Sequence, residues 1–136
     1  MKTLVSVFAI LIFATSCDFY YVEPVPVIPY DPRDQFTGSY GVHEYSSTYD
    51  EYWDYNLQIY KNQFDITIDN FYNTGLRVNA HVNGNALYIP WQIVDGYELQ
   101  GDGSVQGGSI IIDYKIRDTY TANSAWDFCS ASGSLY

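Results

Sequence analysis

From residue 36 onward, apolar and polar residues alternate with a period of two, which favours β-strands over helices. The alternation is clearest in four segments: 53–59, 64–69, 76–83 and 110–117. Because successive side chains of a strand point to opposite faces, each segment presents one apolar and one polar face. The apolar positions therefore predict a shared core, which includes Leu57, Ile66, Val78 and Ile112.

Short turn signals divide this region into eight candidate strands. We place them at 36–45, 51–60, 64–71, 76–82, 86–93, 96–106, 109–117 and 125–134. Hairpins between consecutive strands predict an all-β fold, a single small eight-stranded antiparallel up-and-down barrel, in which closure removes the exposed strand edges. A two-layer β-sandwich is the alternative.

Three two-residue turns are expected to set the register of their hairpins: Lys61-Asn62, Asn83-Gly84 and Gly107-Gly108. Each turn brings apolar residues together: Ile59 opposite Phe64, Ala80 opposite Leu87, and Val105 opposite Ile110. A slip by one residue would turn these side chains to the other face, so the three turns support one common register. On the polar face the Lys61-Asn62 turn places Asp54 opposite Asp69. If a turn at 73–74 sets the next register, Asp69 faces Arg77 and Asp65 faces His81.

Aromatic residues at inward positions are expected to fill the interior of so small a barrel: Phe36, Tyr40, Trp53, Tyr55, Phe64 and Tyr114. Gly101 and Gly103 point inward beside Tyr114 and Ile112 in this scheme. They leave room for bulky rings or for a tight bend.

The start of the chain has the layout of a secretory signal, with Lys2, an apolar run over residues 4–13, and the small residues 14–16 directly before Cys17. A cysteine at that point is typical of a bacterial lipoprotein signal, in which the thiol is acylated and becomes the first residue of the mature chain. The apolar run is shorter than the roughly 20 residues that span a membrane. A plain signal peptide cut nearby is the alternative.

We therefore divide the chain into a signal peptide (1–16), an acylated cysteine with a proline-rich tether (17–35), and the barrel (36–136). The tether holds four prolines: Pro24, Pro26, Pro29 and Pro32. Such spacing favours an extended, semi-rigid spacer. Its apolar residues leave a second possibility, an extra edge strand along the barrel.

The chain is acidic, with 6 Lys and Arg against 16 Asp and Glu. Nucleic acid is therefore excluded as an expected partner, because phosphates demand a basic footprint. Anionic lipid headgroups would repel the domain, so the acyl group (palmitate or a similar chain) on Cys17 is expected to hold it at the bilayer. We expect a location in the cell envelope, at the outer membrane on its periplasmic or surface face. Asp18, directly after the cysteine, resembles an enterobacterial inner-membrane retention signal, so the inner membrane is the alternative location.

Candidate catalytic chemistry is sparse. Besides Cys17, Cys129 is the second of two cysteines, either a buried small apolar residue or a free thiol. His43 and His81 are the only histidines, and nothing guarantees that they converge on a metal. Because no nucleophile, base and oxyanion donor occur in a recognisable motif, we predict a protein that is not an enzyme and that uses no metal or cofactor.

Several short motifs are spread over the mature chain: Tyr30-Asp31-Pro32-Arg33-Asp34, Phe36-x-Gly38-x-Tyr40-x-Val42, Glu44-Tyr45-Ser46, Ile68-Asp69-Asn70-Phe71-Tyr72, Ile89-Pro90-x-Gln92-x-Val94 and Asp127-Phe128-Cys129. In these motifs the chain resembles a family of small bacteroidete lipoproteins, similar in outline to lipocalin-like barrels. The resemblance implies a lipid anchor and a small barrel. It implies no particular activity.

Tyrosine is unusually frequent, with 15 residues, and several fall on the outward face. Four of them form the candidate binding surface: Tyr45, Tyr52, Tyr60 and Tyr88. Exposed tyrosines near Asp and Asn suit sugar rings or protein partners. We therefore expect a membrane-anchored, non-enzymatic binding or structural module of the envelope that contacts a glycan or an envelope protein. Two alternatives remain, an inhibitor of a cationic enzyme such as lysozyme and a lipocalin-like carrier of a small ligand.

Overall fold

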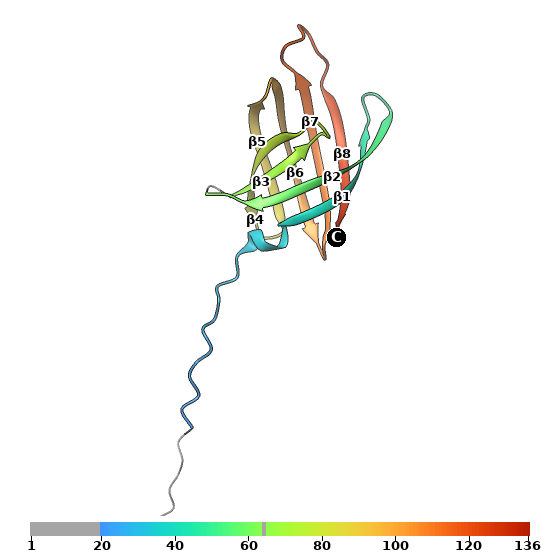
Figure 1. Ribbon diagram of the computed structural model, residues 1–136. Helices are drawn as coiled ribbons and strands as arrows, with labels where there is room; N and C mark the ends of the chain where they lie inside the picture. Colours follow the sequence, from blue (N-terminus) through green and yellow to red (C-terminus); the bar gives the residue numbers. More distant parts are fainter. Residues whose placement is uncertain (1–19, 64) are drawn as a thin grey trace, which may run out of the picture.

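The computed structural model describes residues 20–63 and 65–136, so the predicted signal peptide, Cys17 and Phe64 lie outside the described residues. Eight antiparallel strands follow one another around the sheet, and the last pairs with the first to close a barrel (Figure 1). The predicted up-and-down barrel is confirmed. The elements are η1 (Pro32–Gln35), β1 (Gly38–Ser46), β2 (Glu51–Lys61), β3 (Ile66–Phe71), β4 (Leu76–Asn83), β5 (Ala86–Val94), β6 (Tyr97–Gln106), β7 (Ser109–Asp118) and β8 (Asp127–Leu135).

The core forms as the alternation predicts, because the inward residues of all eight strands meet inside the barrel. The predicted core residues are fully buried: Leu57, Ile66, Val78 and Ile112. Phe36 and Tyr40 are also buried, and the Tyr40 hydroxyl donates a hydrogen bond to the Phe36 carbonyl at 3.0 Å. Phe36 directly precedes β1 and Tyr40 lies near its start, so both belong to the end of the barrel that the tether enters, which we call the closed end.

Alternate connections lie at opposite ends of the barrel because consecutive strands are antiparallel. The end opposite Phe36 carries four connections: β1–β2 (47–50), β3–β4 (72–75), β5–β6 (95–96) and β7–β8 (119–126). We call this end the mouth. Figure 1 shows the tether leaving the barrel beside η1, away from the long β7–β8 connection.

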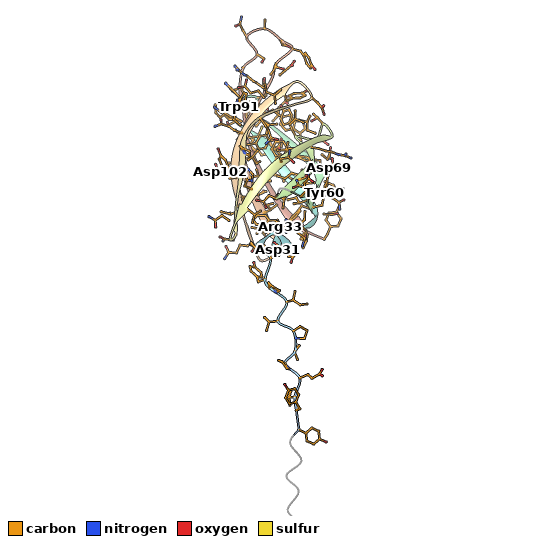
Figure 2. All side chains as sticks on the ribbon, turned by 90° about the vertical axis from the view of Figure 1, so that its left-hand side faces the viewer. Asp31, Arg33, Tyr60, Asp69, Trp91 and Asp102 are labelled. Atoms are coloured by element: carbon orange, nitrogen blue, oxygen red, sulfur yellow. The ribbon has the colours of Figure 1, made fainter. Side chains whose placement is uncertain are left out.

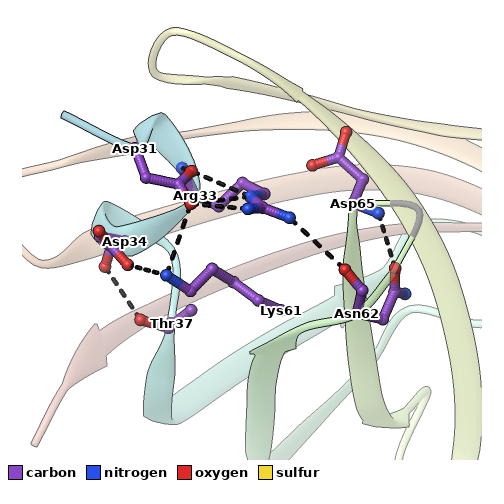
Figure 3. A network of polar contacts seen from close by, with 7 residues as sticks. All are labelled: Asp31, Arg33, Asp34, Thr37, Lys61, Asn62 and Asp65. Carbon is purple, nitrogen blue, oxygen red and sulfur yellow. Dashed lines mark hydrogen bonds and ion pairs between the residues drawn. The ribbon is translucent and has the colours of Figure 1, made fainter. Parts of the chain in front are cut away.

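An ion-pair network fixes the tether to the closed end (Figure 3). The Arg33 guanidinium donates to Asp31 at 2.7 Å, and it holds the pKa of that carboxyl well below its usual range. The Lys61 ammonium lies 2.5 Å from Asp34 and 3.5 Å from Asp31. Figure 2 shows Asp31 and Arg33 where the extended segment meets the barrel. The described part of the tether, residues 20–31, forms no strand, so the alternative of an extra edge strand is not realised there.

One of the three predicted turns forms as expected, and the other two differ from the prediction. Gly107-Gly108 forms the expected turn, with Val105 opposite Ile110. The second turn lies one residue later than predicted: Asn83 pairs with Ala86, which places Val82, not Ala80, opposite Leu87.

The third turn is wider than the predicted Lys61-Asn62, because Lys61 itself pairs with Ile66 and Ile59 pairs with Ile68. The side chain of Asn62 accepts a hydrogen bond from the Asp65 amide at 2.6 Å, which holds this loop (Figure 3). Both shifts move strand partners by an even number of positions, so the apolar faces still coincide.

The register of β2 also changes the polar pairs. Asp54 does not face Asp69 as predicted; it lies opposite His43, whose Nδ1 is 2.6 Å from Asp54 Oδ1. The other two predicted pairs are confirmed: Arg77 lies 3.5 Å from Asp69, and His81 lies 3.6 Å from Asp65.

Gly101 lies opposite Tyr114, as predicted. A Cβ atom at Gly101 would lie 2.5 Å from the Cβ of Tyr114, so a side chain there would force the neighbouring atoms to move. Farther along, the β5–β6 register shifts between Ile89 and Gln92 around Pro90, which has no amide proton for the ladder. Because this irregularity changes the alternation, Ile93 turns outward and is 56% exposed.

Candidate functional site at the mouth of the barrel

The inward face of β1 changes from apolar to polar toward the mouth. Its inward positions are Tyr40, Val42, Glu44 and Ser46 in that order, and all are buried. β8 shows the same change in reverse, with Ala131 and Cys129 leading to Asp127 at its mouth end. Two carboxylates thus lie inside the barrel at the mouth, Glu44 1% exposed and Asp127 2% exposed.

Glu44 is held by phenol groups from two other strands. Its Oε2 accepts hydrogen bonds from the Tyr55 hydroxyl and, at 2.6 Å, from the Tyr114 hydroxyl. Burial raises the pKa of Glu44, because burial penalises the charged form more than these donors favour it. Burial likewise raises the pKa of Tyr55 and Tyr114, so both remain donors at neutral pH.

The Oε1 atom of Glu44 accepts no hydrogen bond from residues 20–63 or 65–136. Glu44 lines a cavity of about 230 Å³ together with Trp53, Tyr72 and Asn73. A buried carboxylate, one oxygen of which accepts neither phenolic hydrogen bond, thus lines a cavity at the mouth.

Asp127 has donors on both oxygens. Ser46 donates to Oδ1, and the Tyr72 hydroxyl donates to Oδ2 at 2.7 Å. Asp127 lines a second cavity of about 220 Å³ under the β7–β8 connection, and Tyr72 borders this cavity as well. The neighbouring Cys129 is a free, buried thiol whose pKa is raised by burial, so it matches the predicted buried residue.

Aromatic rings surround the two carboxylates. Tyr72 lies at the centre, in edge-to-face contact with Trp53 (centroids 6.4 Å apart), Tyr97 (6.3 Å) and Tyr114 (6.3 Å). Its backbone has φ of 57°, a left-handed conformation that bulky residues rarely adopt. Strained residues of this kind concentrate at functional sites. The turn after β3 therefore has a strained backbone at Tyr72, and this conformation places the Tyr72 ring between the two cavities.

The two carboxylates at the mouth have no basic partner among the residues that the structure describes. Within the described residues, no lysine, arginine or histidine forms an ion pair with Glu44 or Asp127. Arg117 borders the Asp127 cavity, but its guanidinium pairs with Glu98 and lies 4.5 Å from the Trp126 ring. No group of three metal-ligating side chains occurs in the part of the chain that the structure covers.

The predicted tyrosine surface is only partly brought together. Tyr45 and Tyr52 lie opposite each other on β1 and β2, with ring centroids 4.7 Å apart. His43 stacks on Tyr52 at 5.2 Å, and the Tyr45 hydroxyl donates to Asp50 at 3.1 Å. This group lies on the outside of the barrel.

Tyr60 and Tyr88 do not join that group. Tyr60 lies near the closed end of β2, and Tyr88 lies on β5 opposite Asp102. Figure 2 shows Tyr60 and Asp102 at opposite edges of the barrel. The four tyrosines therefore do not form one surface.

Sequence reasoning missed the mouth residues, although a signal for them exists. Glu44 has the same inward phase as Tyr40 and Val42, and Asp127 has the same phase as Cys129 and Ala131. An acidic residue at a position whose neighbours two residues away are buried is exceptional, because unpaired charges are rarely buried. Both residues also lie in the quoted motifs, Glu44-Tyr45-Ser46 and Asp127-Phe128-Cys129.

Comparison with protein-family models and with curated proteins found no match to the chain. The resemblance to small bacteroidete lipoproteins stays a prediction. Among the described residues, no helix is long and apolar enough to cross a membrane.

Proposed function

We propose that the chain is a non-enzymatic, lipid-anchored binding protein of the cell envelope that takes up a small ligand at the mouth of its barrel. The observation that carries this proposal is the cavity beside Glu44, where a buried carboxylate with one free oxygen meets aromatic walls. Small-ligand sites are typically concave and largely apolar, with a few placed polar groups. At about 230 Å³ the cavity lies below the usual range of about 300–1,000 Å³, so the ligand is small.

The closed end supports the anchoring part of the proposal. The network of Arg33, Asp31 and Lys61 fixes the tether at the end remote from the mouth. A lipid on Cys17 would then leave the mouth facing away from the bilayer, open to solutes of the envelope. The outer membrane is the proposed location, on its periplasmic or surface face, and nucleic acid is not a proposed partner.

A second candidate is retained because the rings of Tyr45 and Tyr52 form a pair on the outward face. We propose this pair as the contact for a glycan or an envelope protein. The alternative of an inhibitor of a cationic enzyme rests on the net charge of −10 and is tested by a lysozyme assay with micromolar protein.

The test is a fragment screen by ligand-observed NMR on the detergent-solubilised protein, repeated with three variants. Trp53→Ala removes a wall of the mouth cavity, Tyr52→Ala removes the outward ring pair, and Tyr88→Ala is an exposed control. We expect fragment binding to fall with Trp53→Ala alone. If fragments still bind to the Trp53→Ala variant but no longer bind to the Tyr52→Ala variant, the binding site is the outer surface and not the mouth.

The anchor is tested separately. Mass spectrometry of the amino-terminal peptide should show Cys17 as the first residue, carrying acyl chains. Cys17→Ala should move the protein from the detergent phase to the aqueous phase in a Triton X-114 partition. Recovery of an unmodified Cys17 peptide from the membrane fraction would contradict the anchor.

A further inference from the structure

The chemistry of the mouth narrows the class of ligand. Glu44 is 1% exposed, and both of its phenolic donors bind the same oxygen, Oε2. Its other oxygen accepts neither of these bonds, and Glu44 lines the same cavity as Trp53 and Tyr72. Among the described residues no fully buried side-chain oxygen lacks a partner, so this oxygen is accessible, and either water or a ligand can donate a hydrogen bond to it.

The charge requirement points in the same direction. Asp127 adds a second buried carboxylate, and within the described residues neither carboxylate is paired with a basic side chain. The nearby Asp127 charge also raises the pKa of Glu44, after the larger effect of burial. A ligand with a positively charged hydrogen-bond donor would donate to Glu44 Oε1 and would also balance the negative charge of the two carboxylates.

The aromatic residues that line the cavity indicate which kind of group the rest of the ligand carries. Trp53 and Tyr72 meet edge to face, and Tyr72 also contacts Tyr97 and Tyr114. Aromatic faces attract cations and also pack against apolar groups. A ligand with a charged donor at one end and an apolar body is complementary to such walls.

Resting on the proposed function, we infer that the mouth binds a small primary amine with an apolar body, its ammonium donating to Glu44 Oε1 and its body packed against Trp53 and Tyr72. A quaternary ammonium has no N–H to fill that acceptor. Ca²⁺ and Mg²⁺ require six or more oxygen ligands, whereas Asp127 and Glu44 Oε2 are already engaged by Ser46, Tyr72, Tyr55 and Tyr114.

The experiment compares two near-isosteric probes by isothermal titration calorimetry on the detergent-solubilised protein. The probes are 2-phenylethylamine, which carries the ammonium, and 2-phenylethanol, which carries a neutral hydroxyl at the same place. A pH of about 8 keeps the amine protonated, because aliphatic amines titrate near 10. We expect the amine to bind at least about tenfold more tightly than the alcohol, since a charged hydrogen bond is much stronger than a neutral one.

Three variants locate the effect. Glu44→Gln keeps the size of the side chain and its acceptor for the two phenols, and should reduce amine binding to the level of the alcohol. Asp102→Asn removes a carboxylate from the outer surface and should leave both affinities unchanged. Trp53→Leu should weaken both probes, and it tests the wall independently if Glu44→Gln fails to fold by circular dichroism.

Each result of these titrations either supports or contradicts the proposed amine site. Equal affinities for the two probes, or amine binding that survives Glu44→Gln, would overturn the amine while leaving a small-ligand site at the mouth. Absence of amine binding to the unmodified protein would also overturn it, and the fragment screen then decides whether the mouth binds anything else. Loss of amine preference with Glu44→Gln and not with Asp102→Asn supports it.

Discussion

The Tyr72 hydroxyl donates to Asp127 Oδ2 at 2.7 Å, which joins the turn after β3 to the first residue of β8. These residues are 55 positions apart in the chain, and the contact crosses the mouth between the two cavities. Tyr72 holds this position at the cost of a positive φ of 57°. The contact thus fixes the ring that shapes both cavities.

Replacing Tyr72 by Phe keeps the ring and removes the phenolic donor to Asp127. Because Asp127 is 2% exposed, the loss should lower the free energy of unfolding by about 1–3 kcal/mol. Urea denaturation monitored by circular dichroism measures the change. Tyr88→Phe is the matched control, because Tyr88 is 57% exposed, and it should change stability by less than about 0.5 kcal/mol. Equal effects of the two substitutions would mean that the contact contributes nothing.

The ionisation of Glu44 should make stability depend on pH. Its pKa is raised in the folded state above the ordinary value for a glutamate, mainly by burial. The folded state therefore holds this proton more tightly than the unfolded state. The contribution of Glu44 is most favourable below the unfolded pKa and is lost as pH rises through the folded pKa. Each pH unit that separates the two pKa values corresponds to a loss of about 1.4 kcal/mol.

Glu44→Gln removes this loss, so the melting temperature of the variant should rise relative to the unmodified protein as pH increases from about 4. The gain should level off above the folded pKa of Glu44. Thermal melts across the pH range measure it, with Asp102→Asn as a charge-matched control on the outer surface. A variant that is less stable at high pH than at low pH, relative to the unmodified protein, would refute the raised pKa.

Because β6 and β7 lie in close contact at Gly101, a side chain at this position should destabilise the barrel. The Cβ atom of Gly101→Ala would lie 2.5 Å from Tyr114 Cβ and 2.6 Å from the Asp113 carbonyl oxygen. The strands must move apart, so we expect a loss of about 1–3 kcal/mol in unfolding free energy. At Gly41 the added Cβ would lie 3.8 Å from the Tyr136 ring, an ordinary contact. Gly41→Ala should therefore be neutral or slightly stabilising in the same urea titration.

The alternation of residues was sufficient to predict the barrel and its buried face, but not the exact register. Alternation specifies which face a side chain occupies, and a shift by an even number of residues preserves it. The turn after β4 lies one residue later than predicted, with Gly84 at φ of 60°, and this moves the strand partners by two positions. Val78 therefore stays buried. The loop after β2 widened because the side chain of Asn62 binds the Asp65 amide, a contact that no periodicity reveals.

The proposed site at the mouth lies on the inward face, whereas the sequence analysis selected tyrosines on the outward face, for a related reason. Tyrosines on polar positions are conspicuous in the sequence, so Tyr52 and Tyr88 were favoured over residues with inward phase. Glu44 has that inward phase and could have been selected as a buried acid. Tyr72 could not, because it follows a register shift between Asp69 and Phe71 and adopts a left-handed backbone that alternation does not describe.

Cys129 should be inert in the folded protein. It is 5% exposed, and burial raises the pKa of its thiol, so little of the reactive thiolate exists at neutral pH. A thiol reagent such as Ellman's reagent should give no rapid colour with the native protein. Labelling should appear with the rate of unfolding in urea.

The same titration in the unfolded state also counts the free thiols of a chain that has two cysteines. One equivalent is expected if Cys17 carries its lipid, because Cys129 alone then reacts, whereas two equivalents would contradict acylation. Cys129→Ser provides the control and should reduce the count to zero. Rapid labelling of the native protein that disappears with Cys129→Ser would show that the mouth end opens, which would contradict the closed packing around Asp127.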